Sequence, residues 1–169
     1  MTNEHTGFSR RKLLKAGAIG VPAAGLVAFG STLVTATSAN AISTDGWWGS
    51  ETSAGFQRFL NTVVPPSNKI VGGRINLVVD GVISDQPSSM ASSCPGIVGG
   101  WEWVNEPVYG SPTINAMAIW LNLSWAAPFI NSTFINALQQ HYGISPDGRL
   151  DAPSQTIKAL QNEINQWVG

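Results

Sequence analysis

Apolar residues recur at helical spacing in four segments of the chain, covering residues 50–61, 111–122, 132–143 and 154–165. In the last of them, Ile157, Leu160 and Ile164 lie three and four residues apart, so they fall on one face of a helix. Three equivalent stripes consist of Ile114, Met117 and Leu121; of Ile135, Leu138 and Tyr142; and of Phe56 and Leu60. The pattern predicts four amphipathic helices of about three turns each.

Each of these segments has a start signal and a stop signal. A serine, the residue type that caps free N–H groups in a first turn, leads every segment: Ser50, Ser111, Ser132 and Ser154. Asn or Gly, which tolerate the left-handed conformation that ends helices, closes every segment: Asn61, Asn122, Gly143 and Asn165. Aligned on the serines, the segments follow the frame Ser-x-Thr-x-x-Ala-apolar-Gln, with departures such as Gly55, Ala118 and Phe134 in the weaker copies, which indicates degenerate internal repeats.

Asp-Gly pairs, which are turn signals, lie between the copies at Asp45-Gly46, Asp80-Gly81 and Asp147-Gly148, and Ala126-Ala127 takes the corresponding place before the third copy. The insert from Thr62 to Gly110 lacks strict alternation and is rich in loop signals, so we expect irregular structure there. A short hairpin of 77–79 with 82–83 around Asp80-Gly81 is the one regular element that it could contain. The predicted fold is mainly α, a small bundle of four short repeat helices with long irregular loops.

The N-terminus has the composition of an export signal. Ser9-Arg10-Arg11-Lys12-Leu13-Leu14-Lys15 precedes an uncharged stretch to Ala41, and Ala39-Asn40-Ala41 is a small-x-small cleavage site. The order Ser-Arg-Arg-x-Leu-Leu-Lys resembles the twin-arginine signal, which implies export of a folded protein to the cell wall or the medium, with membrane contact only during export. The alternative is an uncleaved membrane anchor. We therefore expect a signal peptide over 1–41, the first helix and a Trp/Gly-rich insert over 42–110, and three tandem repeat helices over 111–169.

Charge and cysteine content narrow the function. Residues 42–169 contain five Lys or Arg and nine Asp or Glu, a net charge of −4 against −1 for the whole chain. Nucleic acid is thereby excluded as a partner, because such binding depends on neutralising phosphates. Cys94 is the sole cysteine and cannot form an internal disulfide. It is interpreted as a buried, inert thiol, with pairing between chains as the alternative.

All seven tryptophans lie in residues 42–169. Flat indole rings stack on the C–H faces of sugars, and neighbouring carboxylates and amides bind sugar hydroxyls. Two Trp-rich clusters are therefore candidate glycan sites: Asp45, Trp47 and Trp48, and Trp101, Glu102, Trp103 and Asn105. The alternative is that these rings fill the core of a small domain.

The ordered set of Asp45-Gly46-Trp47-Trp48-Gly49, Val79-Asp80-Gly81-Val82-Ile83-Ser84, Gly100-Trp101-Glu102-Trp103 and the Ala-Leu-Gln helices resembles the peptidoglycan-binding repeat region of actinobacterial secreted proteins and phage lysin tails. The resemblance covers about residues 43–166 and implies helical modules that hold a protein against murein. Ala126-Ala127 and the extra run Pro65–Asn76 depart from the pattern.

Catalytic patterns are weak by comparison. A muramidase needs two carboxylates across a cleft, for which Glu102, Glu51 and Asp45 are the candidates. Zinc hydrolysis needs clustered His or Cys ligands, whereas residues 42–169 contain only His141 and Cys94. A Cys94 nucleophile would be followed by Pro95, which lacks the N–H that could serve an oxyanion. We expect a non-catalytic, peptidoglycan-binding protein without metal or cofactor. A protein-binding role ranks second, and a cell-wall glycosidase third.

Overall fold

The computed structural model describes residues 39–64, 76–123 and 128–168. The chain divides into two units, 1–35 and 36–169, and the described residues all belong to the second. Most of the predicted export signal, the extra run from Pro65 to Ile75 and the Ala126-Ala127 pair lie outside the described residues. No helix among the described residues is long and apolar enough to cross a membrane.

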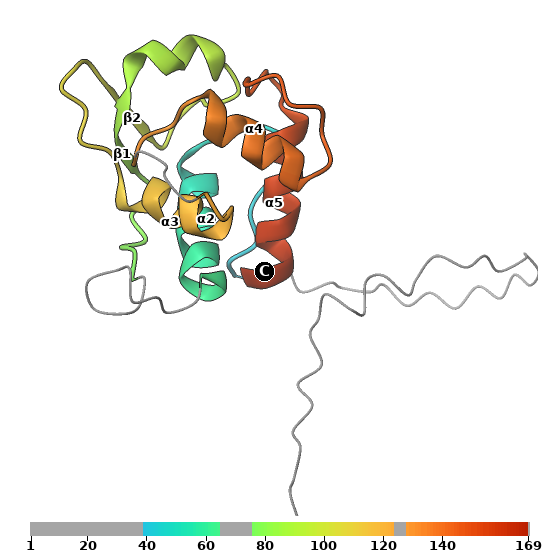
Figure 1. Ribbon diagram of the computed structural model, residues 1–169. Coiled ribbons are helices and arrows are strands. Elements are labelled where there is room, and N and C mark those ends of the chain that lie inside the picture. The colour runs from blue at the N-terminus through green and yellow to red at the C-terminus, as the bar shows by residue number, and fades with distance from the viewer. Residues whose placement is uncertain (1–38, 65–75, 124–127, 169) are drawn as a thin grey trace, which may run out of the picture. The chain divides into compact units, whose positions relative to one another are not determined.

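The predicted helices are present (Figure 1): α2 (Ser50–Val63), α3 (Pro112–Trp120), α4 (Ser132–His141) and α5 (Gln155–Val168). Ser111 caps α3 by accepting from Thr113 N at 3.1 Å, and Ser154 accepts from Ile157 N at 3.3 Å at the start of α5. Asn131, not Ser132, caps α4, and Gly49 precedes Ser50 at α2 without a side-chain cap. All of the leading serines therefore lie at helix beginnings, but only two of them act as caps.

The predicted stops are confirmed for two helices and wrong for the other two. Asn122 (φ 57°) and Gly143 (φ 68°) adopt the left-handed conformation just beyond α3 and α4. Asn61 and Asn165 lie inside α2 and α5, which run on to Val63 and Val168. Their side chains bind neighbouring backbone instead, as described below.

The prediction of a mainly α bundle with an irregular insert is wrong. The insert contains strand β1 (Ile83–Pro87), the short 3-10 helix η2 (Ser88–Ser93) and strand β2 (Trp101–Val104). The strands pair in parallel, with Ile83 opposite Trp101, so the predicted hairpin around Asp80-Gly81 does not form. A parallel pair requires a crossover, here η2 and its flanking loops, and such long-range pairing leaves little local signal in sequence. The described fold is therefore mixed α and β.

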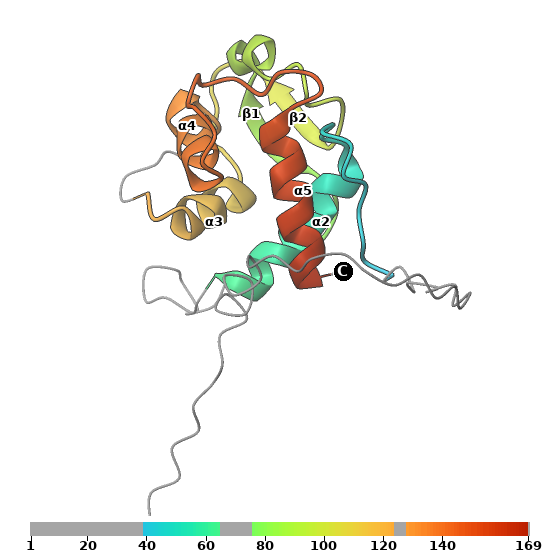
Figure 2. The same cartoon turned by 90° about the vertical axis from the view of Figure 1, so that its right-hand side faces the viewer.

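Helices α2 and α5 form the centre of the core and pack against each other (Figure 2). Phe56, Phe59 and Leu60 of α2 and Ile157 and Leu160 of α5 are fully buried. All of them except Phe59 belong to the predicted apolar stripes, together with the buried Ile114, Met117, Ile135, Leu138 and Ile164. Hydrophobic burial of these stripes is the main favourable term in folding.

A buried glutamine on each of three helices holds an Asp-Gly turn through both ends of its carboxamide. Gln161 Nε2 donates to Asp45 Oδ1 (3.2 Å) and to Trp47 O (2.9 Å), while Gly46 N donates to Gln161 Oε1 (2.9 Å). We call this arrangement the Gln clasp. It recurs for Gln57 on Asp80-Gly81-Val82 and for Gln139 on Asp147-Gly148-Arg149. In each turn the Asp Oδ1 also accepts from the backbone N–H two residues later, at 2.9 Å.

On α2 and α5 an asparagine one turn further along the helix extends the clasp. Asn165 accepts from Ile42 N and donates to Ile42 O, both at 2.8 Å. Asn61 makes the same two bonds with Leu77. Ile42 and Leu77 both lie three residues before the aspartate of their turn, so the two helices hold their turns in the same register.

The segment led by Ser111 lacks both partners of the clasp. Ala118 stands where the other helices carry glutamine, and Ala126 stands eight residues later, as Asp147 does after Gln139. The backbone geometry of the helix end is nevertheless retained. Leu123 N donates to Ala118 O (2.8 Å) just as Ile144 N donates to Gln139 O (2.9 Å). This segment therefore lacks both the glutamine and the aspartate of the clasp, so it contains no buried glutamine whose carboxamide would need the turn as a partner.

We expect Gln161→Leu to lower the free energy of unfolding by about 3 kcal/mol, because it leaves buried backbone groups of the Asp45 turn without partners. Such a loss corresponds to a melting temperature lower by roughly 10 °C or more in a domain of this size. Thermal unfolding followed by circular dichroism measures it. Gln166→Leu, at an exposed position of the same helix, is the matched control. Equal melting temperatures for the two variants would show that the clasp contributes nothing.

Candidate functional site

Trp48 is the buried base of a row of indole rings. It is 1% exposed, and its Nε1 donates to Ser53 Oγ at 2.9 Å. Ser53 in turn donates to Gly100 O at 2.9 Å, which ties α2 to the residue before β2. The Trp48 ring meets the Trp101 ring edge-on, with centroids 5.2 Å apart and planes at 84°. The prediction of Trp48 as a ligand contact is therefore replaced by a core role.

Trp101 and Trp103 form a stacked pair on β2. Their centroids lie 5.4 Å apart and their planes differ by 23°. Residues two apart in a strand point to the same side, which brings the two rings together. Both side chains are partly exposed, and the buried Trp101 Nε1 has no hydrogen-bond partner among the described residues. We call Trp48, Trp101 and Trp103 the Trp ladder.

Two further predicted site residues, Glu102 and Asn105, lie in or directly after β2, next to Trp101 and Trp103 in the sequence. Asn105 follows β2 directly, and its Oδ1 accepts from Ser88 Oγ at 2.7 Å. Glu102 is exposed, and strand alternation directs it away from Trp101 and Trp103. It therefore lacks the enclosed, apolar surroundings of a catalytic general acid.

Asp45 and Trp47 do not belong to the ladder. Asp45 accepts from Trp47 N and from Gln161, so it is a structural member of a Gln clasp. Trp47 is 38% exposed and makes no ring contact with another described aromatic residue. The structure thus brings Trp101 and Trp103 of one predicted cluster together with Trp48 of the other, and it leaves Glu102, Asp45 and Trp47 outside this group.

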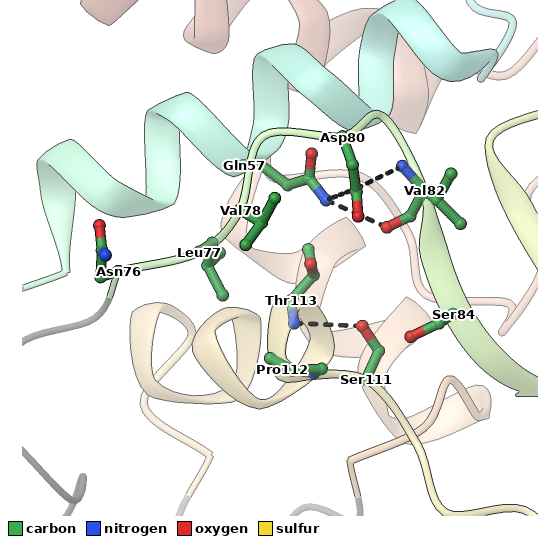
Figure 3. Close-up of a pocket in the computed structure, with 10 residues that line it drawn as sticks. All are labelled: Gln57, Asn76, Leu77, Val78, Asp80, Val82, Ser84, Ser111, Pro112 and Thr113. Atoms are coloured by element: carbon green, nitrogen blue, oxygen red, sulfur yellow. Dashed lines mark hydrogen bonds between the residues drawn. The ribbon is translucent and has the colours of Figure 1, made fainter.

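A cleft of about 240 Å³ was not predicted from the sequence. It lies between the 76–84 segment and the start of α3, and Figure 3 shows its lining side chains. Its polar lining comes from Gln57, Asn76, Asp80, Ser84, Ser111 and Thr113. The sequence around Ser111 and Thr113 indicated only the start of a helix, and nothing local indicated that residues 76–84 lie opposite them.

The aspartates of the three clasps have lowered pKa values. For Asp80 and Asp147 the main cause is the hydrogen bond from Gln57 or Gln139, and for Asp45 it is the bond from Trp47 N, followed by that from Gln161. These donors stabilise the carboxylate form, so all three turns carry an ionised aspartate at neutral pH.

Cys94 and His141 lie in settings that differ from a catalytic pair. Cys94 is 1% exposed, and burial raises the pKa of its thiol to about 11, although the charge of Arg149 acts in the opposite direction. His141 Nε2 lies 3.1 Å from Glu163 Oε2, and the His141 ring contacts Trp120. Among the described residues, no group of three or more His, Cys, Asp or Glu could hold a metal ion.

We expect the stability of the domain to fall with pH in acid. An aspartate whose pKa is lower in the folded state stabilises the fold above its unfolded pKa, and that contribution is lost as the pH falls through the folded value. Melting temperatures measured between about pH 5 and pH 2 should therefore decline. The combined variant Asp45→Asn, Asp80→Asn, Asp147→Asn should show a shallower decline. An unchanged slope in the triple variant would contradict the assignment to the clasps.

Cys94 should resist alkylation in the folded protein. With a pKa of about 11, the thiolate fraction at pH 8 is on the order of one in a thousand, and burial restricts access further. Mass spectrometry after iodoacetamide treatment should show little labelling in buffer and rapid labelling in guanidinium. Rapid labelling of the native protein would indicate that the thiol is reachable.

Comparison with known proteins gave no relative for this chain. No protein-family model matches it, and neither the curated proteins nor the solved structures gave a match.

Proposed function

We propose that residues 42–169 form an exported, non-catalytic module that binds the glycan of bacterial peptidoglycan, with Trp101 and Trp103 of the Trp ladder as its binding surface and the buried Trp48 as their support. The observation that carries this proposal is the stacked, partly exposed indole pair of Trp101 and Trp103. An aromatic pair whose function is only to fill the core would be expected to lie under other elements, as Trp48 does.

The ladder is well suited to sugar stacking because its rings are fixed before any ligand arrives. Trp103 stacks on Trp101, Trp101 meets Trp48 edge-on, and Trp48 is held by Ser53. Binding to such a preorganised surface orders few side chains and so avoids much of the entropic cost of association. Asn105, directly after β2, adds a polar group of the kind that binds sugar hydroxyls.

Peptidoglycan is favoured as the source of the glycan by three features outside the ladder. The paired arginines and Ala39-Asn40-Ala41 are typical of an exported bacterial protein. The ordered Asp-Gly, Trp and helix motifs resemble peptidoglycan-binding repeats. The Gln clasp, made three times with the same atoms, supports the interpretation of those motifs as related copies.

A glycosidase is disfavoured by the placement of the acids. Retaining and inverting enzymes both need two carboxyl groups facing one another across the scissile bond. Asp45 is hydrogen-bonded into its turn, Glu102 is exposed, and Glu51 lies in the first turn of α2, where its charge complements the helix dipole. These positions offer no facing pair beside the ladder.

We expect the purified protein to sediment with isolated murein sacculi and Trp103→Ala to weaken that binding about tenfold, which corresponds to about 1.4 kcal/mol. Trp103→Phe, which keeps a flat ring, should retain most of the affinity. Titrating sacculi and measuring the unbound protein gives the apparent dissociation constants.

Trp167→Ala is the matched control, because Trp167 is 44% exposed at the end of α5 and contacts Phe59 rather than the ladder. It should sediment like the unchanged protein. Failure of the unchanged protein to sediment would overturn the proposal and favour a protein partner. Release of soluble muropeptides during the assay would instead identify an enzyme.

A further inference from the structure

The cleft beside α3 has features of a binding site that the ladder does not explain. Its volume is about 240 Å³, below the roughly 300–1,000 Å³ of sites for drug-sized ligands, so it suits a group of about one sugar ring. Val78, Val82 and Pro112 give it apolar walls. No residue predicted as a glycan contact lines it.

Thr113 contributes a hydroxyl group to the cleft that is available to bind a ligand. The residue as a whole is 3% exposed, and its hydroxyl makes no hydrogen bond with any described residue. Figure 3 shows it directed from α3 toward the 76–84 segment across the cleft. The hydroxyl oxygen keeps enough exposure in the cleft to contact a ligand that accepts its proton.

Ser84 and Ser111 add two further hydroxyls, one from β1 and one from the start of α3, and Figure 3 shows that of Ser84 directed toward Ser111. Ser111 Oγ already accepts from Thr113 N at 3.1 Å, so its remaining capacity includes donating its own proton. Asp80 Oδ1 accepts from Gln57 Nε2 and Val82 N, while its Oδ2 accepts from no described residue. The cleft therefore offers hydroxyl donors and a carboxylate acceptor.

The charge of the lining disfavours anions. Among the described residues that line the cleft, Asp80 is the single charged one, and none of them is Lys, Arg or His. The start of α3 does not compensate for it, because Thr113 N is occupied by Ser111 and Pro112 has no N–H. Neutral ligands with hydroxyl groups fit this chemistry, and carboxylate-bearing ligands do not.

We infer that this cleft is a second subsite, which binds one neutral N-acetylated sugar ring and rejects its acidic counterpart. The acetamido carbonyl would accept from Thr113, its methyl group would lie against Val78 and Val82, and ring hydroxyls would bind Ser84 and Asp80. The inference deepens the function proposed above and rests on it for the choice of sugar.

The test is a titration of the full-length protein with N-acetylglucosamine and, separately, with N-acetylmuramic acid, which adds a carboxylate-bearing lactyl group to the same ring. Nuclear magnetic resonance should detect a dissociation constant on the order of millimolar for the neutral sugar, a value typical of so small a ligand. Binding of N-acetylmuramic acid should be at least about tenfold weaker, because its carboxylate would lie beside Asp80.

Thr113→Val, which removes the hydroxyl at nearly constant volume, should weaken binding of N-acetylglucosamine about fivefold, the effect of one neutral hydrogen bond. Thr133→Val, at an exposed position of α4, is the matched control and should bind like the unchanged protein. Asp80→Asn keeps an oxygen for Gln57 and Val82 but removes the charge, so it should narrow the difference between the two sugars. Melting temperatures of all variants separate loss of binding from loss of folding.

Absence of N-acetylglucosamine binding, equal binding of the two sugars, or an unaltered affinity in a folded Thr113→Val variant would each overturn the inference. Trp103→Ala separates the two proposals, because it should weaken sedimentation with sacculi while leaving binding of the sugar in the cleft unchanged, as followed through the resonances of the lining residues Val78 and Thr113. A protein that binds sacculi through Trp103 but takes no sugar in the cleft would retain the proposed function without this subsite.

Discussion

The Gln clasp is the interaction on which the arrangement of this domain depends. A carboxamide offers one acceptor and two donors, and an Asp-Gly turn presents a free N–H, a carboxylate and a carbonyl within its reach. Gln57, Gln139 and Gln161 are at most 3% exposed, so each would be costly to bury without those partners. Apolar stripes could pack together in several registers, whereas a buried amide tolerates only the one that satisfies it.

The clasp of Gln161 also joins the two ends of the domain. Asp45 lies 116 residues before Gln161, and Ile42 lies 123 residues before Asn165, so these bonds hold the beginning of the described chain against its last helix. Ala39–Ala41, the predicted cleavage site, lies immediately before this anchored segment and is exposed. Cleavage before Ile42 would remove the exposed residues while leaving both bonds to Asn165 in place.

Local signals in the sequence predicted the helices but not the contacts between distant segments. Apolar spacing and cap residues located the four helices because both act within a few residues. The same reasoning treated Asn61 and Asn165 as stops, since nothing local showed that Leu77 and Ile42 would occupy their carboxamides. The sequence did contain a signal for the clasp. Asp147 follows Gln139 at the same spacing at which Ala126 follows Ala118, so the copy that lacks the glutamine also lacks the aspartate. The parallel pairing of β1 with β2 lacked any such signal, so the sequence indicated the Trp101 and Trp103 cluster but neither its contact with Trp48 nor the cleft.

The candidate site arises where the chain departs from its own repeated pattern. After Asp45-Gly46 and Asp147-Gly148 the chain reaches a helix within a few residues, at Ser50 and Ser154. After Asp80-Gly81 it enters β1, η2 and β2 before reaching the cap Ser111. That excursion carries Trp101 and Trp103 and places Ser84 opposite α3. Because Gln57 fixes Asp80-Gly81 and Ile83 pairs with Trp101, one clasp sets the position of the cleft and of the ladder. The glycan surface proposed here is thus an addition to one copy, supported by the same buried amide that serves only for structure in the others.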